Sequence, residues 1–196
     1  MAQLAPRTVC WRQLWNERLK GKGAGVEHLL LSELGADSVL IAFDEDHGPF
    51  RLNYGLTWDE NWQIREARLH VVSEYYTRWL TLLTDGRGQW HDADGEALPD
   101  LDGCLDIDIW PTPFTNSFPM RRESLSIGER KEFRMAWIFA PDLTVKSQAQ
   151  AYTRVEDGLY LFESLDGSGF MAKLPVDEDR IVLDYPGLFE RVRDEA

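Results

Sequence analysis

The chain has 196 residues, 43% of them hydrophobic, which is enough for one domain with a full core but too short for two domains of ordinary size. Its 21 basic and 34 acidic residues give a formal net charge of −13, which repels nucleic-acid phosphates and anionic membrane surfaces at long range. We therefore expect a single domain over residues 1–196 and no nucleic-acid partner.

The sequence carries no signal for a metal or a cofactor. Cys10, Cys104 and the four scattered histidines form no Cys-x-x-Cys or His-x-x-x-His pair. A glycine-rich phosphate loop, a Gly-x-Ser-x-Gly motif and a dinucleotide fingerprint are also missing. No apolar run approaches the ~20 residues that span a bilayer, and the first residues lack the apolar core of a secretory signal. We expect a cytoplasmic protein without a transmembrane segment, a metal or a cofactor.

The first half of the chain alternates apolar and polar residues, the pattern of half-buried β-strands. The N-terminal segment, with Trp11, Leu14 and Trp15, is expected to cover a sheet edge, and residues 21–25 form a loop. Strands are predicted over residues 26–33, 38–44, 50–59, 63–72 and 77–84, with a turn at residues 35–37. Asp-Gly pairs at 85–86, 94–95, 157–158 and 166–167 are typical hairpin turns.

Residues 104–125 are the most distinctive stretch. Strict alternation predicts a strand with Leu105, Ile107 and Ile109 on one face and with Cys104, Asp106, Asp108 and Trp110 on the other. Pro111 and Pro113 must end that strand. A short helix is predicted next, capped by Thr115, Asn116 or Ser117, with Pro119 in its first turn and no further breaker over residues 120–125. It would carry Arg121 and Arg122.

The two acids and the two arginines predict a charged cluster. Paired aspartates on a strand face are more often solvated than functional, but buried arginines need carboxylate partners. Such a cluster can fix the helix or receive a polar headgroup. Adjacent helix residues point roughly 100° apart, so we expect one arginine to pair with the acids and the other to reach a ligand.

The second half predicts further strands over residues 132–140, 144–156, 159–163, 170–175 and 180–185, and a terminal turn over 188–192 that packs against an edge. Trp137 lies on the most continuous apolar face and is expected to be buried, so that its truncation costs about 3 to 5 kcal/mol. Tyr152, Tyr160 and Tyr185 need hydrogen-bond partners if they are buried. Short strands separated by frequent turns indicate a mostly β, antiparallel meander, barrel or roll.

Several motifs resemble those of the bacterial "putative glycolipid-binding" proteins. They are Gly103-Cys104-Leu105-Asp106-Ile107-Asp108, Thr112-Pro113-Phe114-Thr115-Asn116, Pro119-Met120-Arg121-Arg122 and Asp184-Tyr185-Pro186-Gly187-Leu188-Phe189. The resemblance covers nearly the whole chain. It implies a spiral β-roll, a many-stranded antiparallel sheet curled around one central helix, and it implies a homodimer.

Three functions are consistent with these observations. The favoured one is a non-catalytic protein that binds a glycolipid or another amphiphile in an apolar crevice between sheet and helix. Its expected site residues are Asp106, Asp108, Asn116, Arg121, Arg122, Trp137, Tyr152 and Tyr185. The alternative is a glycoconjugate hydrolase that uses Asp106 and Asp108, whose side chains would lie roughly 6 to 7 Å apart, as acid and base. Against this, nearby arginines should lower both carboxylate pKa values, whereas a general acid needs a raised one. The third hypothesis is that the cluster only holds the helix in the roll.

Overall fold

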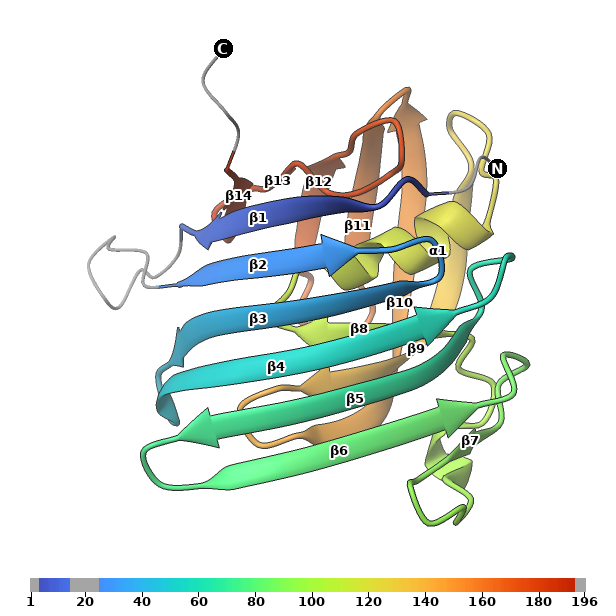
Figure 1. The fold of residues 1–196 in the computed structure, drawn as a ribbon. Coiled ribbons are helices and arrows are strands. Elements are labelled where there is room, and N and C mark those ends of the chain that lie inside the picture. The colour runs from blue at the N-terminus through green and yellow to red at the C-terminus, as the bar shows by residue number, and fades with distance from the viewer. Residues whose placement is uncertain (1–3, 15–24, 193–196) are drawn as a thin grey trace.

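The fold is a roll of two β-sheets with one short α-helix between them (Figure 1). The structure, a computed structural model, describes residues 4–14 and 25–192 of the chain. Within these residues one sheet has nine strands and the other has five. The expected mostly β architecture, a large sheet curled around one helix, is confirmed.

The nine-stranded sheet combines strands from both ends of the chain. Its spatial order is β13 (Asp184–Tyr185), β14 (Phe189–Arg191), β1 (Arg7–Gln13), β2 (Val26–Leu31), β3 (Gly35–Asp44), β4 (Gly48–Trp58), β5 (Ile64–Ser73), β6 (Thr77–Thr84) and β7 (Trp90–His91). Every neighbouring pair is antiparallel. In β3 the alternate residues Ala36, Ser38, Leu40 and Ala42 are buried. One face of this sheet therefore builds the core, as the alternating sequence predicts.

The five-stranded sheet carries most of the residues predicted to be functional. Its spatial order is β12 (Met171–Pro175), β11 (Leu159–Ser164), β10 (Thr144–Glu156), β9 (Arg130–Phe139) and β8 (Asp106–Trp110). The pair of β8 and β9 is parallel, with Asp108 opposite Trp137, and the other pairs are antiparallel. A parallel pair needs a crossover connection, and the helical segment after β8 lies in that connection.

The two sheets are joined at one edge of the roll. After β12, Val176 forms an antiparallel bridge with Val182, and the Leu183 amide donates a 2.8 Å hydrogen bond to the Pro175 carbonyl. These contacts link β12 of one sheet to the approach of β13 in the other. Hydrogen bonding therefore continues around the roll, in keeping with the spiral arrangement that the family resemblance implies.

The helical segment packs between the sheets. A 3₁₀ turn, η2 (Phe114–Asn116), leads directly into α1 (Ser117–Arg122). Asn116, one of the three predicted residues, lies at the N-cap position of this helix, without a side-chain capping hydrogen bond, and the helix ends at Arg122, earlier than the breaker-free run to Leu125 allows. A second 3₁₀ turn is η1 (Pro99–Leu101). Phe118 is fully buried, with its ring centroid 5.4 Å from that of Trp58 on β4. Burying such a side chain stabilises the fold by about 2 to 3 kcal/mol, which holds α1 against the nine-stranded sheet.

Three details of the sequence prediction are wrong. Residues 35–37 belong to β3, and the turn lies at residues 32–34, where the Ser32 amide bonds to the Gly35 carbonyl. Residues 189–191 form strand β14 where a terminal turn over 188–192 is predicted, because their backbone pairs with β1. Strand β1 itself lies between β14 and β2 and does not cover an edge. Trp15 and residues 21–24, predicted as part of the edge cover and of the loop, lie outside the described residues.

Candidate ligand-binding site

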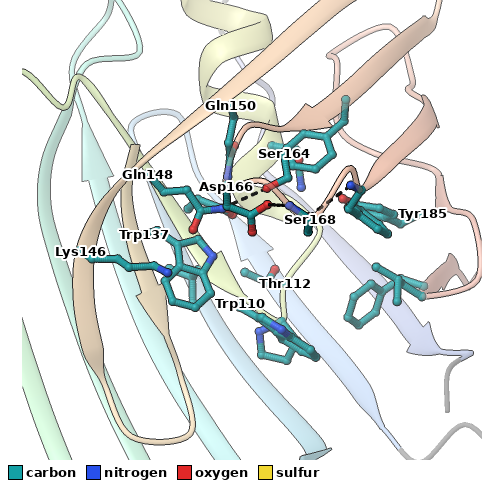
Figure 2. A pocket seen from close by; sticks show the side chains of 18 residues that line it. Trp110, Thr112, Trp137, Lys146, Gln148, Gln150, Ser164, Asp166, Ser168 and Tyr185 are labelled. Carbon is teal, nitrogen blue, oxygen red and sulfur yellow. Dashed lines mark hydrogen bonds between the residues drawn. The ribbon is translucent and has the colours of Figure 1, made fainter. Parts of the chain in front are cut away.

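A pocket of about 390 Å³ opens on the inner face of the five-stranded sheet (Figure 2). Residues from β8 to β11, the turn after β8, the β11–β12 turn and the β13–β14 segment surround it. They are Asp108, Ile109, Trp110, Pro111, Thr112, Asn116, Trp137, Lys146, Gln148, Gln150, Phe162, Ser164, Asp166, Ser168, Phe170, Tyr185, Leu188 and Phe189. This volume lies within the range of small-molecule sites in proteins.

Asp108 is the acid at the polar side of the pocket. Gln150 on β10 donates a 2.5 Å hydrogen bond to its Oδ2 atom, and the Thr115 hydroxyl donates one of 3.1 Å to Oδ1. The backbone amide of Ile109 in turn donates to Thr115 Oγ1. Burial raises the pKa of Asp108, and the two hydrogen bonds offset only part of that rise. The carboxyl group is fixed in place and can exchange hydrogen bonds with a ligand hydroxyl.

Asn116 lies beside Asp108 and is held by two further hydrogen bonds. The Tyr152 hydroxyl donates to Asn116 Oδ1 at 2.8 Å, and Asn116 Nδ2 donates to the Pro113 carbonyl at 3.2 Å. Tyr152 is fully buried and lies behind the pocket wall rather than in it. Its predicted need for a buried hydrogen-bond partner is met by Asn116, so Tyr152 acts as a support.

Asp166 brings a second carboxylate to the pocket from the β11–β12 turn. The Ser168 amide donates to Asp166 Oδ1 at 2.9 Å. Hydrogen bonds from Ser168 and from Ser164 lower the pKa of Asp166, so this acid keeps its charge near neutral pH. In Figure 2 Asp166 lies with Gln148, Gln150 and Ser164 along one side of the pocket. This side offers amide, hydroxyl and carboxylate groups.

Aromatic rings form the other walls. Trp110 and Trp137 lie together in Figure 2, and the Trp137 ring stacks on Phe139 with centroids 5.9 Å apart. At the other end Phe162, Phe170 and Tyr185 pack together with centroid distances of 6.1 to 6.2 Å. Phe170 is 41% exposed. The pocket is thus lined by polar groups on one side and by aromatic rings that reach the surface on another.

Trp137 does not occupy the core position that the sequence predicts. It is half-buried at the pocket, and the ammonium of Lys146 lies 4.5 Å from its ring centroid. The fully buried residues of β9 are Met135, Ala136 and Ile138. The apolar stripe is continuous, but it packs against the core at one end and lines the pocket at the other. A large stability loss on truncation is therefore no longer expected.

Asp106 and Arg122 form a buried ion pair outside the pocket. Arg122 Nε and NH2 donate to the two carboxylate oxygens of Asp106 at 3.0 and 2.7 Å, and Asp106 has no exposed surface. Burial raises the pKa of Asp106 despite the arginine. The expectation that arginines would lower both aspartate pKa values is wrong, because burial outweighs the charge of Arg122 at Asp106 and no arginine hydrogen bond reaches Asp108 among the described residues.

Arg121 points elsewhere, as the 100° offset of neighbouring helix residues requires. Its guanidinium donates to the backbone carbonyl of Asp179 and lies 4.2 Å from the ring centroid of Trp62. Arg121 and Arg122 line a separate hollow of about 370 Å³ together with Glu60, Asn61, Trp62, Gln63 and Ser124. The two arginines therefore do not form the polar end of the pocket that contains Asp108.

The structure thus brings four of the eight predicted site residues to one pocket, namely Asp108, Asn116, Trp137 and Tyr185. Sequence reasoning missed Gln148, Gln150, Ser164 and Asp166 because they lie on distant strands and turns. It also missed Glu27, a fully buried acid on β2. The signal for Glu27 is its inward position in an alternating strand, on the same face as Leu29 and Leu31.

Glu27 connects the nine-stranded sheet to the floor of the pocket. Its Oε1 atom accepts hydrogen bonds from Tyr54 at 2.5 Å, from Ser38 at 2.9 Å and from Thr112 at 2.9 Å. Thr112 also lines the pocket. Burial raises the pKa of Glu27 to about 7, against the opposing effect of the three hydroxyl groups. A carboxyl group that titrates near neutral pH therefore lies directly behind the pocket.

The described part of the chain contains neither a metal-binding cluster nor a membrane-spanning helix. No group of three or more His, Cys, Asp or Glu side chains is placed to hold a metal ion within residues 4–14 and 25–192. In the same part of the chain, no helix is long and apolar enough to cross a membrane.

Comparison with known proteins gives one family and one similar structure. A family model described as "Putative glycolipid-binding" matches residues 8–191. The crystal structure of a DUF1089 family protein from Pseudomonas aeruginosa is similar, with a TM-score of 0.85 and 54% sequence identity over 87% of this chain and 94% of that one. No curated protein matches the chain.

Proposed function

Since the chain belongs to the "Putative glycolipid-binding" family, we propose that it binds an amphiphilic small molecule of the glycolipid type in the pocket beside Asp108. The headgroup lies against Asp108, Gln150 and the side chains of the β11–β12 turn. The alkyl chain leaves past Phe162, Phe170 and Tyr185. The protein acts on its ligand by binding and not by catalysis.

One observation carries this proposal: the division of the pocket lining into a polar and an aromatic side. Hydroxyl groups of a sugar can bond to Asp108 and Gln150, which are already fixed by buried partners. The indoles of Trp110 and Trp137 provide flat apolar faces for the carbon side of a sugar ring. Phe170, 41% exposed, offers an apolar path toward the surface. A wholly apolar ligand would remove water from the polar side of the pocket without offering it hydrogen bonds.

The alternative function, a hydrolase that uses Asp106 and Asp108, requires both carboxyl groups to reach the substrate, and Asp106 does not. Asp106 has no exposed surface and both of its oxygens bond to Arg122, so it cannot reach a substrate in the pocket. A general acid or base must come within hydrogen-bond distance of the proton it transfers. The reaction through Asp106 and Asp108 therefore has no support in the geometry, and we do not propose it.

We also propose that the protein forms a homodimer and is located in the cytoplasm, as expected from the sequence. The outer face of the nine-stranded sheet supports the dimer, since Val26 and Ile41 are paired across β2 and β3 and are 42% and 51% exposed. Sedimentation equilibrium over a range of protein concentrations tests it. A monomer at all concentrations would contradict it.

Truncation of Trp137 tests the binding proposal. We expect Trp137→Ala to weaken the binding of octyl β-D-glucoside by tenfold or more, because a pocket wall is lost. The free energy of unfolding should fall by only about 1 to 2 kcal/mol, because the indole is half-buried. Titration calorimetry and urea denaturation measure the two effects.

Trp79→Ala is the matched control. Trp79 is 71% exposed on β6 and stacks on His70, away from the pocket. It should leave the affinity for octyl β-D-glucoside unchanged. An equal loss of affinity in both variants, or no loss in Trp137→Ala, would place the ligand elsewhere. Mass spectrometry of lipids extracted from the protein purified from its own host would then identify what the chain retains.

A further inference from the structure

The charges around the pocket restrict the headgroup that can enter it. The ionisable side chains in the lining are Asp108, Asp166, Lys146 and Tyr185. Tyr185 is neutral, because burial and the nearby Asp108 carboxylate raise its pKa far above the usual value. Two acids and one base remain, so the balance depends on where these three charges lie.

The single base, Lys146, already has a partner. It is exposed on β10, and its ammonium lies 4.5 Å from the centroid of the Trp137 ring. Water screens its charge, as it screens the charge of Asp166, which is exposed as well. The ammonium also makes a cation–π contact with the Trp137 ring, which stabilises its charge without an anion.

The two acids face the polar side, where a headgroup would lie. Asp108 is half-buried and held by Gln150 and Thr115, so water screens its charge less than it screens the charges of Asp166 and Lys146. Asp166 stays ionised, because Ser164 and Ser168 stabilise its charged form. Both carboxyl groups can accept hydrogen bonds from sugar hydroxyl groups. Asp166 repels a phosphate, a sulfate or a sugar acid, and Asp108, whose pKa is raised by burial, adds to this repulsion at a pH above that pKa.

We infer that the pocket admits an uncharged sugar headgroup and excludes anionic headgroups, with Asp108 and Asp166 as the residues that exclude them. This inference rests on the proposed function, because it concerns the headgroup of the amphiphile. It also distinguishes a glycolipid from the phospholipids and fatty acids that share its alkyl chain. A like charge about 4 Å from an acid weakens binding by about fivefold at the dielectric constant of water, and by more near a protein surface.

The test compares octyl β-D-glucoside with octyl β-D-glucuronide, both below their micelle concentrations. The two ligands share their chain and ring and differ by the carboxylate of the glucuronide. With the wild-type protein we expect the glucoside to bind at least tenfold more tightly. The ratio of the two affinities should shrink as salt is added, since salt screens the repulsion.

Two variants assign the effect to residues. In Asp108→Asn and in Asp166→Ser, the ratio of glucoside to glucuronide affinity should fall by threefold or more. Asp157→Ser is the control, since Asp157 also precedes a turn glycine, at the other end of β11, and its side chain is 86% exposed outside the pocket. It changes the net charge equally and should leave the ratio at the wild-type value.

The outcomes separate the two proposals. If neither ligand binds, the proposed function itself fails. If the glucuronide binds as tightly as the glucoside, amphiphile binding stands and the charge inference is overturned. A ratio that stays at the wild-type value in both pocket variants, or that falls equally in Asp157→Ser, removes the role assigned to the two acids.

Discussion

Replacing Arg122 by methionine should lower the free energy of unfolding by about 3 to 5 kcal/mol, because it leaves the Asp106 carboxylate buried without its charged partner. Asp106 has no exposed surface, and Arg122 donates hydrogen bonds to both of its oxygens. Arg122 also pairs with Glu123 at 2.6 Å and lies 5.7 Å from the Phe133 ring centroid. The pair therefore joins α1 to both β8 and β9.

The double variant shows whether the loss comes from the stranded charge. Combining Arg122→Met with Asp106→Asn should restore part of the lost stability, because the second change removes the buried charge. Arg130→Met is the control: Arg130 is 40% exposed and pairs with Glu132 and Glu163 at the surface, so it should cost about 1 kcal/mol or less. Urea denaturation of the wild type, the single variants Arg122→Met and Asp106→Asn and the double variant gives the cycle, and Arg130→Met is measured beside them. Absence of any rescue would show that Arg122 acts through its packing instead.

The sequence predicts which face of a strand a residue occupies, but not how deep it lies. Alternation correctly puts Asp106 and Asp108 on one face of β8. The same pattern cannot tell that α1 covers Asp106 while Asp108 opens to the pocket. How deeply each aspartate is buried depends on the crossover connection after β8, which places Arg122 over Asp106. The path of this connection is set by tertiary packing and cannot be predicted from the strand pattern.

The same limit explains the error at Trp137. The apolar stripe of β9 is present as predicted, and Phe133 and Met135 are buried. A pocket and a core are both lined by large apolar side chains, so composition alone does not separate them. Only the neighbours of Trp137 on β10, Lys146 and Gln148, show that the stripe ends at a polar pocket.

Pocket residues that lie on distant strands can be predicted only when the order of the strands in the sheet is known. Gln150 meets Asp108 across 42 positions of sequence because β10 and β8 both neighbour β9. This strand order follows from the parallel pairing of β8 with β9. A sequence interpreted as consecutive antiparallel strands does not predict that pairing. The sequence identifies Asp166 only as part of an Asp-Gly turn, and the structure places this residue in the lining of the pocket.

Glu27 should make the stability of the protein fall as the pH rises from about 4.5 to about 7. Its pKa is about 7 in the folded protein, against an ordinary value of 4.5. Between these pH values the folded state holds a proton that the unfolded state has lost, so raising the pH favours unfolding. Each unit of difference corresponds to about 1.4 kcal/mol, and the loss reaches about 3 kcal/mol. Above pH 7 both states are ionised and the loss is constant.

Glu27→Gln removes this dependence and isolates it from the other raised pKa values. Asp106 and Asp108 also have raised pKa values and destabilise the fold in the same direction, but they titrate in both proteins. The difference in unfolding free energy between wild type and Glu27→Gln should therefore change by about 3 kcal/mol across this range. An amide at residue 27 keeps an acceptor for Ser38, Tyr54 and Thr112, and any cost of burying its NH2 group is independent of pH. Glu33→Gln, at an exposed position, is the control for net charge. Parallel pH profiles for wild type and Glu27→Gln would show that the carboxyl group behind Thr112 titrates at an ordinary pKa, and that the pocket floor carries no proton near neutral pH.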